Sequence, residues 1–232
     1  MSIRKVRRRE ALGAMGAAGA ALVFGCGSSP TSPDTTSANT TTTTGSTNAA
    51  CAVTPGETAG PYPSVVDLFR SDIRDGRTGT LLTLTVKVVN VNAGCAAVAN
   101  ADVEVWHCDS AGNYSEYGTE RAENYLRGIQ TTNGNGEVTF TTIYPGWYQG
   151  RATHIHLEVK TGGVSRKITQ IAFPESTNNT VYRTGVYASR GSNPTSNLSD
   201  GIFADSLSSE LVTPSGDPTV GYSAGCQVAI SV

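Results

Sequence analysis

Alternating apolar and polar residues recur along the chain after residue 80 and predict short β-strands. In residues 152–160, Ile155, Leu157 and Val159 alternate with His154 and His156, which places both imidazoles on one face of a strand. Alternating or β-branched segments predict further strands at 82–91, 102–108, 137–143, 166–173 and 224–232. No stretch shows a sustained helical period. The pattern therefore predicts an all-β fold, a single antiparallel β-sandwich domain.

Turn-forming residues separate these predicted strands. Residues 109–113 predict a turn that leads to Tyr114, and the Asn-Gly-Asn-Gly sequence at 133–136 predicts a β-hairpin. Two prolines, Pro61 and Pro63, restrict the backbone of the segment 57–63, which we expect to be an ordered loop. Residues 189–200 are rich in Ser, Asn and Gly and predict another loop.

The first 50 residues differ in composition from the rest. Residues 1–25 combine five basic residues, Arg8 and Arg9 among them, with a short apolar run, which predicts a twin-arginine export signal. A small residue precedes Cys26, as in lipoprotein signals, so Cys26 is a candidate lipidation site. Residues 26–50 are mostly Ser, Thr, Asn and Gly and predict a disordered spacer, which leaves 51–232 for the folded domain. We therefore expect an extracytoplasmic protein, either secreted or lipid-anchored at the cell envelope.

Charge and hydropathy exclude several classes of partner. The formal net charge is −2, and the five basic residues and Glu10 give residues 1–25 a charge of +4, so the rest of the chain carries −6. An acidic domain of this kind does not favour nucleic acid. No stretch after the signal approaches 18 consecutive apolar residues. A membrane contact is expected only through the lipid.

Four cysteines lie in the predicted domain, namely Cys51, Cys95, Cys108 and Cys226. An even number in an exported protein indicates two disulfides. Four cysteines allow three pairings, and the sequence does not choose among them. Our working hypothesis pairs Cys51 with Cys95 and Cys108 with Cys226, and the alternative is that one or more thiols are buried and free.

Tyrosines and histidines form a candidate metal site. Residues two apart on a strand lie about 6.6 Å apart, so His154 and His156 can reach one ion. Tyr114 and Tyr148 supply phenol oxygens, and no carboxylate lies between Tyr148 and His156 to complete a two-His, one-carboxylate triad. Because a phenol titrates at about pH 10, binding as phenolate requires a highly charged cation, and Fe(III) is the prediction. The alternatives are copper or zinc at these residues, or histidines that only form the polar face of a half-exposed strand.

Five motifs occur in the order and spacing of one enzyme family. They are Glu-Thr-Ala-Gly-Pro-Tyr at 57–62, Val-Glu-Val-Trp at 103–106 followed by Gly-Asn-Tyr at 112–114, Pro-Gly-Trp-Tyr at 145–148, Arg-Ala-Thr-His-Ile-His at 151–156 and Thr-Gln at 169–170. With these motifs, the chain from residue 57 to about residue 173 resembles the intradiol ring-cleaving dioxygenases, the family of protocatechuate 3,4-dioxygenase and catechol 1,2-dioxygenase.

The resemblance implies a β-sandwich that holds one mononuclear non-haem Fe(III) ion. The four implied metal ligands are Tyr114, Tyr148, His154 and His156. The resemblance also places Arg151 and Gln170 beside the iron as catalytic residues, and makes Pro61, Tyr62 and Arg151 contacts of the substrate. Tyr148 would be the ligand that leaves when substrate binds and that takes up a substrate proton. The implied activity is cleavage of catechol-type aromatics with O2 to cis,cis-muconate-type diacids.

The chain also departs from the better-known members of this family. Only five residues separate Tyr148 from His154, where the protocatechuate enzymes carry a longer insert, and the helical N-terminal dimerisation region of the catechol enzymes has no counterpart. The preferred catechol and the oligomeric state therefore stay open. His107 is interpreted as structural and Trp106 as part of the core. The rival hypothesis is a non-catalytic extracytoplasmic β-sandwich binding module, in which these tyrosines and histidines are ordinary surface and core residues.

Overall fold

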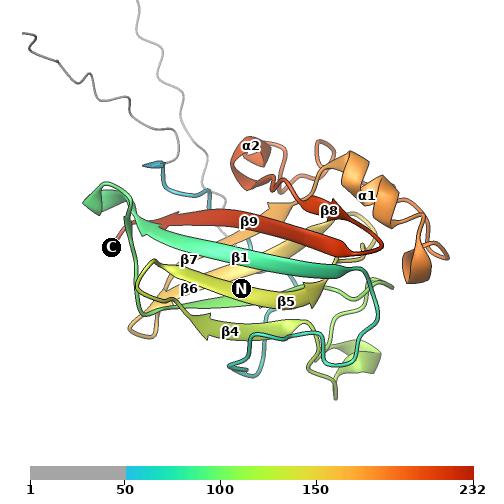
Figure 1. The fold of residues 1–232 in the computed structure, drawn as a ribbon, viewed down its shortest axis with the longest axis horizontal. Helices are drawn as coiled ribbons and strands as arrows, with labels where there is room; N and C mark the ends of the chain where they lie inside the picture. The colour runs from blue at the N-terminus through green and yellow to red at the C-terminus, as the bar shows by residue number, and fades with distance from the viewer. Residues whose placement is uncertain (1–50) are drawn as a thin grey trace, which may run out of the picture. The chain divides into compact units, whose positions relative to one another are not determined.

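Residues 51–232 are described by a computed structural model and are drawn in colour in Figure 1. The predicted export signal, the predicted spacer and the candidate lipidation site Cys26 lie outside the described residues. These three expectations therefore stay predictions. Within residues 51–232, none of the helices has the length and apolar character needed to cross a membrane.

Strand β6 (His154–Thr161) shows the predicted alternation. Ile155, Leu157 and Val159 are fully buried in the core between the sheets, while His154 and His156 point to the opposite face of the strand. The two imidazoles are buried as well, because loops and a neighbouring strand cover that end of the sheet. β6 therefore contributes to the core with one face and to the candidate site with the other.

Two sheets pack face to face. The four-stranded sheet has the order β4–β3–β6–β7, and its pairs are all antiparallel. The bounds of its other strands are β3 (Ala101–Trp106), β4 (Arg127–Thr131) and β7 (Val164–Ala172). The five-stranded sheet has the order β2–β1–β9–β8, with β5 also paired to β1. Its strands are β1 (Leu81–Asn90), β2 (Ala96–Ala97), β5 (Glu137–Ile143), β8 (Ser215–Asp217) and β9 (Gly221–Ile230).

The predicted all-β sandwich is confirmed, with one correction to its strand pairing. β1 and β9 run parallel over their whole register, from Leu82 beside Tyr222 to Asn90 beside Ile230, so the sandwich is not purely antiparallel. Parallel neighbours need a long crossover. The chain supplies one here, because it builds the whole second sheet and two helices between β1 and β9 (Figure 1).

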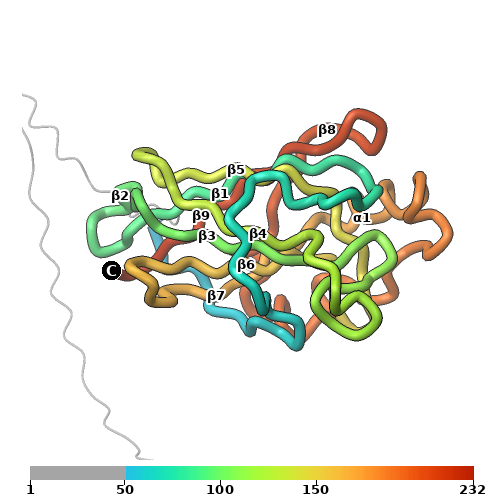
Figure 2. The backbone as a smooth tube through the Cα atoms, turned by 90° about the horizontal axis from the view of Figure 1, so that it is seen from below, coloured from blue at the N-terminus to red at the C-terminus, as the bar shows by residue number. Residues whose placement is uncertain are grey.

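The core lies between the two sheets. Leu84 and Val86 of β1 and Phe140 of β5 meet Val105 of β3 and Leu157 of β6, and each of these side chains is at most 1% exposed. In Figure 2, β5 and β1 lie above β6 and β7, which shows the two layers that enclose these residues. Burial of apolar side chains on this scale is the main favourable contribution to folding.

The predicted strands lie within three residues of the observed ones, but several elements were not predicted. β4 was missed because Arg127 and Gly128 occupy buried positions that the alternation pattern assigns to apolar residues. The helices α1 (Glu175–Val181) and α2 (Leu207–Glu210) are too short to show a helical period, as are the 3₁₀ helices at Val91–Ala93, Gly118–Glu120 and Gly185–Tyr187. Residues 189–200 contain no helix or strand, as predicted.

The Asn-Gly-Asn-Gly turn forms, but the predicted hairpin is wrong. Gly136 donates its N–H to the carbonyl of Asn133 at 2.9 Å and has a φ of +73°, which favours glycine. The strands on either side do not pair with each other, because β4 pairs with β3 and β5 pairs with β1. The turn therefore carries the chain from one sheet to the other.

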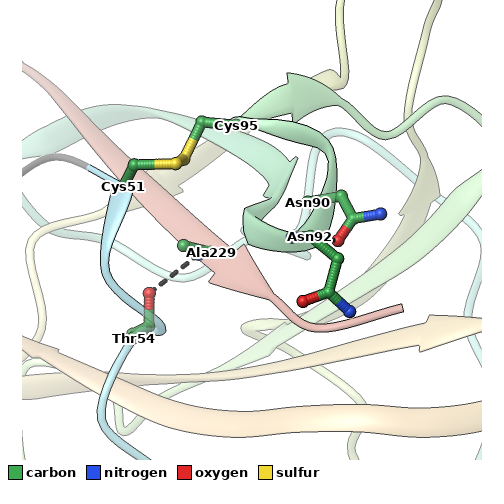
Figure 3. The surroundings of a disulfide bond; sticks show 6 residues. All are labelled: Cys51, Thr54, Asn90, Asn92, Cys95 and Ala229. Carbon is green, nitrogen blue, oxygen red and sulfur yellow. Dashed lines mark hydrogen bonds between the residues drawn. A yellow bond between two sulfur atoms is a disulfide. The ribbon is translucent and has the colours of Figure 1, made fainter. Parts of the chain in front are cut away.

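A disulfide joins the start of the described chain to the loop after β1. Cys51 is bonded to Cys95, which confirms one of the two predicted pairs (Figure 3). The same segment is held by Thr54, which donates its N–H to the carbonyl of Ala229 at 3.0 Å and accepts the N–H of Ala229 on its hydroxyl at 2.8 Å. The segment is thus fixed to both β9 and the end of β1.

The predicted Cys108–Cys226 disulfide is wrong, since both thiols are free. Cys108 follows β3 of the four-stranded sheet and packs with Trp106 and Tyr114. Cys226 lies in the middle of β9, in the five-stranded sheet, where it is paired with Val86 of β1. Packed sheets are about 10 Å apart, whereas a disulfide needs Cα atoms within about 7 Å.

We expect the Cys51–Cys95 bond to contribute strongly to stability. It links residues 44 positions apart, and the chain-entropy estimate for a loop of that size is about 4 kcal/mol. Replacing both cysteines with serine should lower the free energy of unfolding by about that amount, measured by urea denaturation. Cys226→Ala is the control and should have a much smaller effect. Equal midpoints for the double variant and the unchanged protein would contradict this prediction.

Candidate metal centre

The two histidines of β6 bring their Nε2 atoms together. His154 is 3% exposed, His156 is 1% exposed, and the two Nε2 atoms are 3.1 Å apart. The register of β6 places His156 between Trp106 of β3 and Gln170 of β7. The pair therefore occupies the end of β6 that is covered on both sides by neighbouring strands.

The tautomer of His154 follows from its hydrogen bond. Its Nδ1 lies 2.6 Å from the carbonyl oxygen of Ala152, which can only accept, so Nδ1 carries the proton and Nε2 keeps a lone pair. Burial lowers the pKa of His154 to about 3 and the pKa of His156 well below its ordinary value. Both imidazoles are therefore neutral at neutral pH, which is the form that binds metal ions.

Two tyrosines approach this pair from loops. The phenol oxygen of Tyr114 lies 3.4 Å from Nε2 of His154, and the ring of Tyr148 is 5.5 Å from the ring of His154 and 5.8 Å from that of Tyr114. Tyr114 is 4% exposed, whereas Tyr148 is only half-buried. Burial is the main cause that raises the pKa of both phenols, so without a cation both are neutral.

Two loops hold these tyrosines side by side. Asp109 closes the predicted turn by accepting the N–H groups of Ala111 and Asn113 on its carboxylate, each at 2.9 Å. A Cβ at Gly112 would lie 2.3 Å from the carbonyl oxygen of Trp147, and one at Gly146 would lie 2.3 Å from that of Asp109. Both glycines are therefore required for the loops that carry Tyr114 and Tyr148 to pack closely.

Two imidazole nitrogens and the oxygen of Tyr114 are spaced to fit a metal ion that binds imidazole and phenolate, and the ring of Tyr148 lies beside them. Two ring nitrogens bound to one ion at about 2.1 Å each are about 3 Å apart when the bonds meet at about 90°, and the observed separation is 3.1 Å. Among residues 51–232, no group of three or more His, Cys, Asp and Glu side chains is placed to hold a metal. The phenol oxygen of Tyr114, 3.4 Å from Nε2 of His154, is the further donor that the structure places beside the histidine pair.

Arg151 lies beside the cluster and is fixed by three side chains. Its Nε donates to the carboxylate of Asp200 at 2.8 Å, one terminal nitrogen donates to the amide oxygen of Gln170 at 2.6 Å, and the other lies 3.5 Å from the phenol oxygen of Tyr148. The amide nitrogen of Gln170 in turn donates to the carbonyl of Thr58 at 2.8 Å. Arg151 and Gln170 thus lie where the sequence motifs place them, next to Tyr148.

Tyr62 covers the cluster from the 57–63 loop. Its ring stacks on Tyr114 with centroids 4.6 Å apart, and it meets Tyr148 edge-on at 5.9 Å. Pro61 is exposed beside it. The side chain of Arg127 is 1% exposed and donates to the carbonyl of Tyr62 at 3.0 Å. The ring of Tyr62 thus forms an aromatic wall of the cluster, and the buried guanidinium of Arg127 holds the backbone of Tyr62 in place.

Two residues of this environment were not found from the sequence. Asp200 lies in the Ser-, Asn- and Gly-rich loop, and nothing in its local sequence marks it as the partner of Arg151. Arg127 looked like an ordinary charged residue, and only its full burial reveals its role. Only an indirect signal for Asp200 was present in the sequence. An arginine that is buried needs a carboxylate partner, so the prediction of Arg151 beside the metal implied an acidic residue elsewhere in the chain.

The remaining histidine and tryptophan lie where the sequence analysis expected them. His107 is buried, with Nδ1 bonded to the carbonyl of Cys108 at 2.9 Å and Nε2 to the hydroxyl of Thr142 at 2.7 Å, which leaves neither nitrogen for a metal. Burial lowers its pKa to about 4. Trp106 is 1% exposed and packs in the cluster with Tyr114.

A cavity of about 510 Å³ lies elsewhere, at the edge of the sandwich between the segment 52–55, β7, α2 and β9. Its lining includes Gln170 and Glu210 but none of the two tyrosines and two histidines. The 510 Å³ cavity therefore does not coincide with the candidate metal centre. The close approach of the two histidines and two tyrosines identifies the site, and the volume of the cavity does not.

We expect the Arg151–Asp200 pair to stabilise the fold. Asp200 is 1% exposed and Arg151 14% exposed, so Asp200→Ala leaves a largely buried cation without its partner and should lower the free energy of unfolding by about 3 kcal/mol. The control is Asp72→Ala, which removes an ion pair whose side chains are 51% and 43% exposed and should cost less than about 1 kcal/mol. Similar losses in urea denaturation for both variants would refute a special role for Asp200.

Comparison with known proteins agrees with this geometry. A family model described as "Dioxygenase" matches residues 61–192, a range that contains both tyrosines and both histidines of the cluster. Among solved structures, an intradiol ring-cleavage dioxygenase from Tetranychus urticae is 32% identical, with a TM-score of 0.70 over 78% of this chain and 95% of that chain.

Two further structures extend the comparison. The dioxygenase domain of a dioxygenase carbohydrate-binding protein fusion from Streptomyces sp. SirexAA-E is 25% identical, with a TM-score of 0.60 over 78% of this chain and 99% of that one. Catechol 1,2-dioxygenase from Pseudomonas arvilla C-1 is 19% identical, with a TM-score of 0.58 over 77% of this chain and 62% of that chain, and supports the fold alone. The family match and the T. urticae relative together show that this chain belongs to the intradiol ring-cleavage dioxygenases.

Proposed function

We propose that this protein is an Fe(III)-dependent dioxygenase that cleaves catechol-type aromatics with O2 to cis,cis-muconate-type diacids. The observation that carries the proposal is the 3.1 Å approach of the Nε2 atoms of His154 and His156, with the phenols of Tyr114 and Tyr148 beside them. Membership of the intradiol family supports the reaction class.

The donor set explains the choice of ion. His154 and His156 supply neutral nitrogens, and Tyr114 and Tyr148 supply oxygens whose pKa burial has raised. Only a cation of high charge can hold such phenols as phenolates. Two phenolates offset two of the three charges of Fe(III), which reduces the cost of a charged centre in a site that largely excludes water. Held by these four residues, Fe(III) would supply a Lewis acid that withdraws electron density from a catecholate ring and makes the ring reactive toward O2.

The two tyrosines are proposed to act differently, because their surroundings differ. Tyr114 is buried, stacked on Tyr62 and close to the guanidinium of Arg127 at 5.8 Å, so it is held in place. Tyr148 is half-buried, and its phenol oxygen contacts Arg151. Tyr148 is therefore the residue that, as a phenolate, can accept a proton from a catechol hydroxyl on its oxygen and move aside for substrate as the neutral phenol.

Arg151 is proposed to bind the negative charge that develops on the substrate oxygens. Its guanidinium is held by Asp200 on one side and Gln170 on the other, so the donor facing Tyr148 is oriented before substrate arrives. A preoriented cation stabilises developing charge without reorganisation during the reaction. Tyr62, stacked on Tyr114, offers an aromatic wall for the catechol ring.

We further propose that the enzyme acts outside the cytoplasm, as a secreted or lipid-anchored protein. The basic, twin-arginine start of the sequence and Cys26 support this proposal. The disulfide between Cys51 and Cys95 also supports it, since disulfides persist mainly in oxidising compartments.

The colour of the protein tests the metal centre. Phenolate bound to Fe(III) absorbs visible light, so iron-loaded protein should be reddish, and Tyr148→Phe should weaken and shift the visible band. Tyr117→Phe is the matched control, because Tyr117 packs edge-on against Tyr62 at 5.3 Å and bonds to the carbonyl of Pro63. The spectrum of this control should be unchanged. A colourless protein that retains no iron by elemental analysis would refute the proposal.

The role of Arg151 is tested by turnover. Arg151→Ala should leave the iron content unchanged but lower the rate of catechol-dependent O2 uptake by about 10²–10³-fold. Arg151→Lys keeps the charge but loses the planar fork, and should recover only part of the rate. Arg74→Ala, at an exposed arginine paired with Asp72, should have full activity. A rate unchanged in Arg151→Ala would remove Arg151 from the mechanism.

A further inference from the structure

Packing on the ring of His156, and no hydrogen bond at its Nδ1, orients this side chain. The ring stacks on Trp106 with centroids 4.9 Å apart and an angle of 2° between the planes. Its Nδ1 is buried and has no hydrogen-bond partner. Metal-binding histidines usually donate this second nitrogen to an acceptor, which fixes the ring. His154 follows that rule through the carbonyl of Ala152, and His156 does not.

Gly60 contacts the same ring from the loop that carries Pro61 and Tyr62. A Cβ built at Gly60 would lie 3.0 Å from Cε1 and 3.5 Å from Nε2 of His156. Gly60 also has a φ of +70°, and its N–H donates to the hydroxyl of Thr58 at 3.1 Å. Any larger residue would press on the edge of the ring that contains Nε2, the atom proposed to bind iron.

We propose that Trp106 and Gly60 are positioning residues that together set the direction of the His156 Nε2 lone pair. Trp106 fixes the plane of the ring, and Gly60 limits its rotation within that plane. This inference rests on the proposed function only in making Nε2 of His156 a metal ligand. It explains why a glycine stands in the Glu-Thr-Ala-Gly-Pro-Tyr motif and why the ring of Trp106 lies against a side chain of the candidate site.

The 57–63 loop links the Gly60 contact with His156 to Gln170 and Arg151, the two other residues beside the proposed metal centre. The carbonyl of Thr58 accepts the amide of Gln170, which holds Arg151, while Gly60 packs on His156. Displacement of the loop at Gly60 therefore alters both a proposed metal ligand and the arginine network. Trp106 packs on His156 and Tyr114, whereas Gly60 lies in the loop that holds Gln170, so the two contacts with His156 can be changed separately by mutation.

The test compares two glycines with the same backbone geometry. Gly60→Ala adds a methyl group against His156, whereas Gly76→Ala adds one at a φ of +77° with no atom within 4 Å. In metal-free protein, the ring signals of the three histidines are followed by NMR, and affinity for Zn²⁺ is measured by competition. Gly60→Ala should shift the His156 signals, leave those of His107 in place, and weaken Zn²⁺ binding by about tenfold or more. Gly76→Ala should change neither.

The role of Trp106 is tested by replacing it first with a non-aromatic residue and then with another aromatic residue. Trp106→Leu removes the flat surface and should shift the His156 ring signals downfield, with a similar loss of Zn²⁺ affinity. Trp106→Phe restores an aromatic face and should recover most of the affinity. Gly60 lies in a loop, so Gly60→Ala provides the answer on its own if a Trp106 variant does not fold.

Two results would overturn the inference. One is an unchanged His156 spectrum and Zn²⁺ affinity in Gly60→Ala. The other is an equal loss in Gly60→Ala and Gly76→Ala, which would attribute the effect to backbone strain. Failure of the proposed function is a separate result, because it would appear as unmodified protein that binds no iron and has no visible band. The NMR comparison needs neither iron nor turnover.

Discussion

The close approach of two neutral imidazole nitrogens in a buried site is the constraint on which the rest of this structure depends. His154 presents a lone pair on Nε2, and Nε2 of His156 lies 3.1 Å from it, so a proton or a cation lies between the two nitrogens. Burial disfavours protonation of both rings. The fold therefore holds His154 and His156 at a separation that also fits two nitrogens bound to one metal ion, and the pairing of β6 with β3 and β7 sets the position of His156.

Two buried ion pairs support this arrangement from opposite sides. Arg151 is paired with Asp200, and Arg127 lies 3.4 Å from the carboxylate of Glu116. Each cation also contacts one tyrosine of the cluster, Arg151 at Tyr148 and Arg127 at Tyr114. Both guanidiniums act to lower the pKa of Tyr114, and Arg151 acts to lower the pKa of Tyr148, which offsets part of the larger opposite effect of burial.

Sequence reasoning reached the parts of the fold that follow a local period and missed those set by distant contacts. The alternation around His154 and His156 was sufficient to predict β6 and the direction of both rings. The strand at Arg127 was missed because a buried charge breaks the alternation, and the pairing of Cys108 was wrong because sheet membership cannot be obtained from spacing. Asp200 escaped notice because its partner is 49 residues away and its own loop is unremarkable.

The Cys51–Cys95 disulfide fixes the first described residue at the end of the sandwich away from the cluster of tyrosines and histidines. It lies at the Asn90 end of β1, whereas the cluster lies toward Leu81, since Leu82 pairs with Thr142 and Thr142 bonds to His107 beside Trp106. Figures 1 and 2 show the Asn90 end of β1 and helix α1 at opposite ends of the sandwich. The chain reaches the cluster from Cys51 only by running along the sandwich, where Thr54 bonds to Ala229 and Glu57 to Ile168, before Thr58 meets Gln170. The disulfide thus anchors, at the far end of the sandwich, the same segment that continues into the aromatic wall of the site.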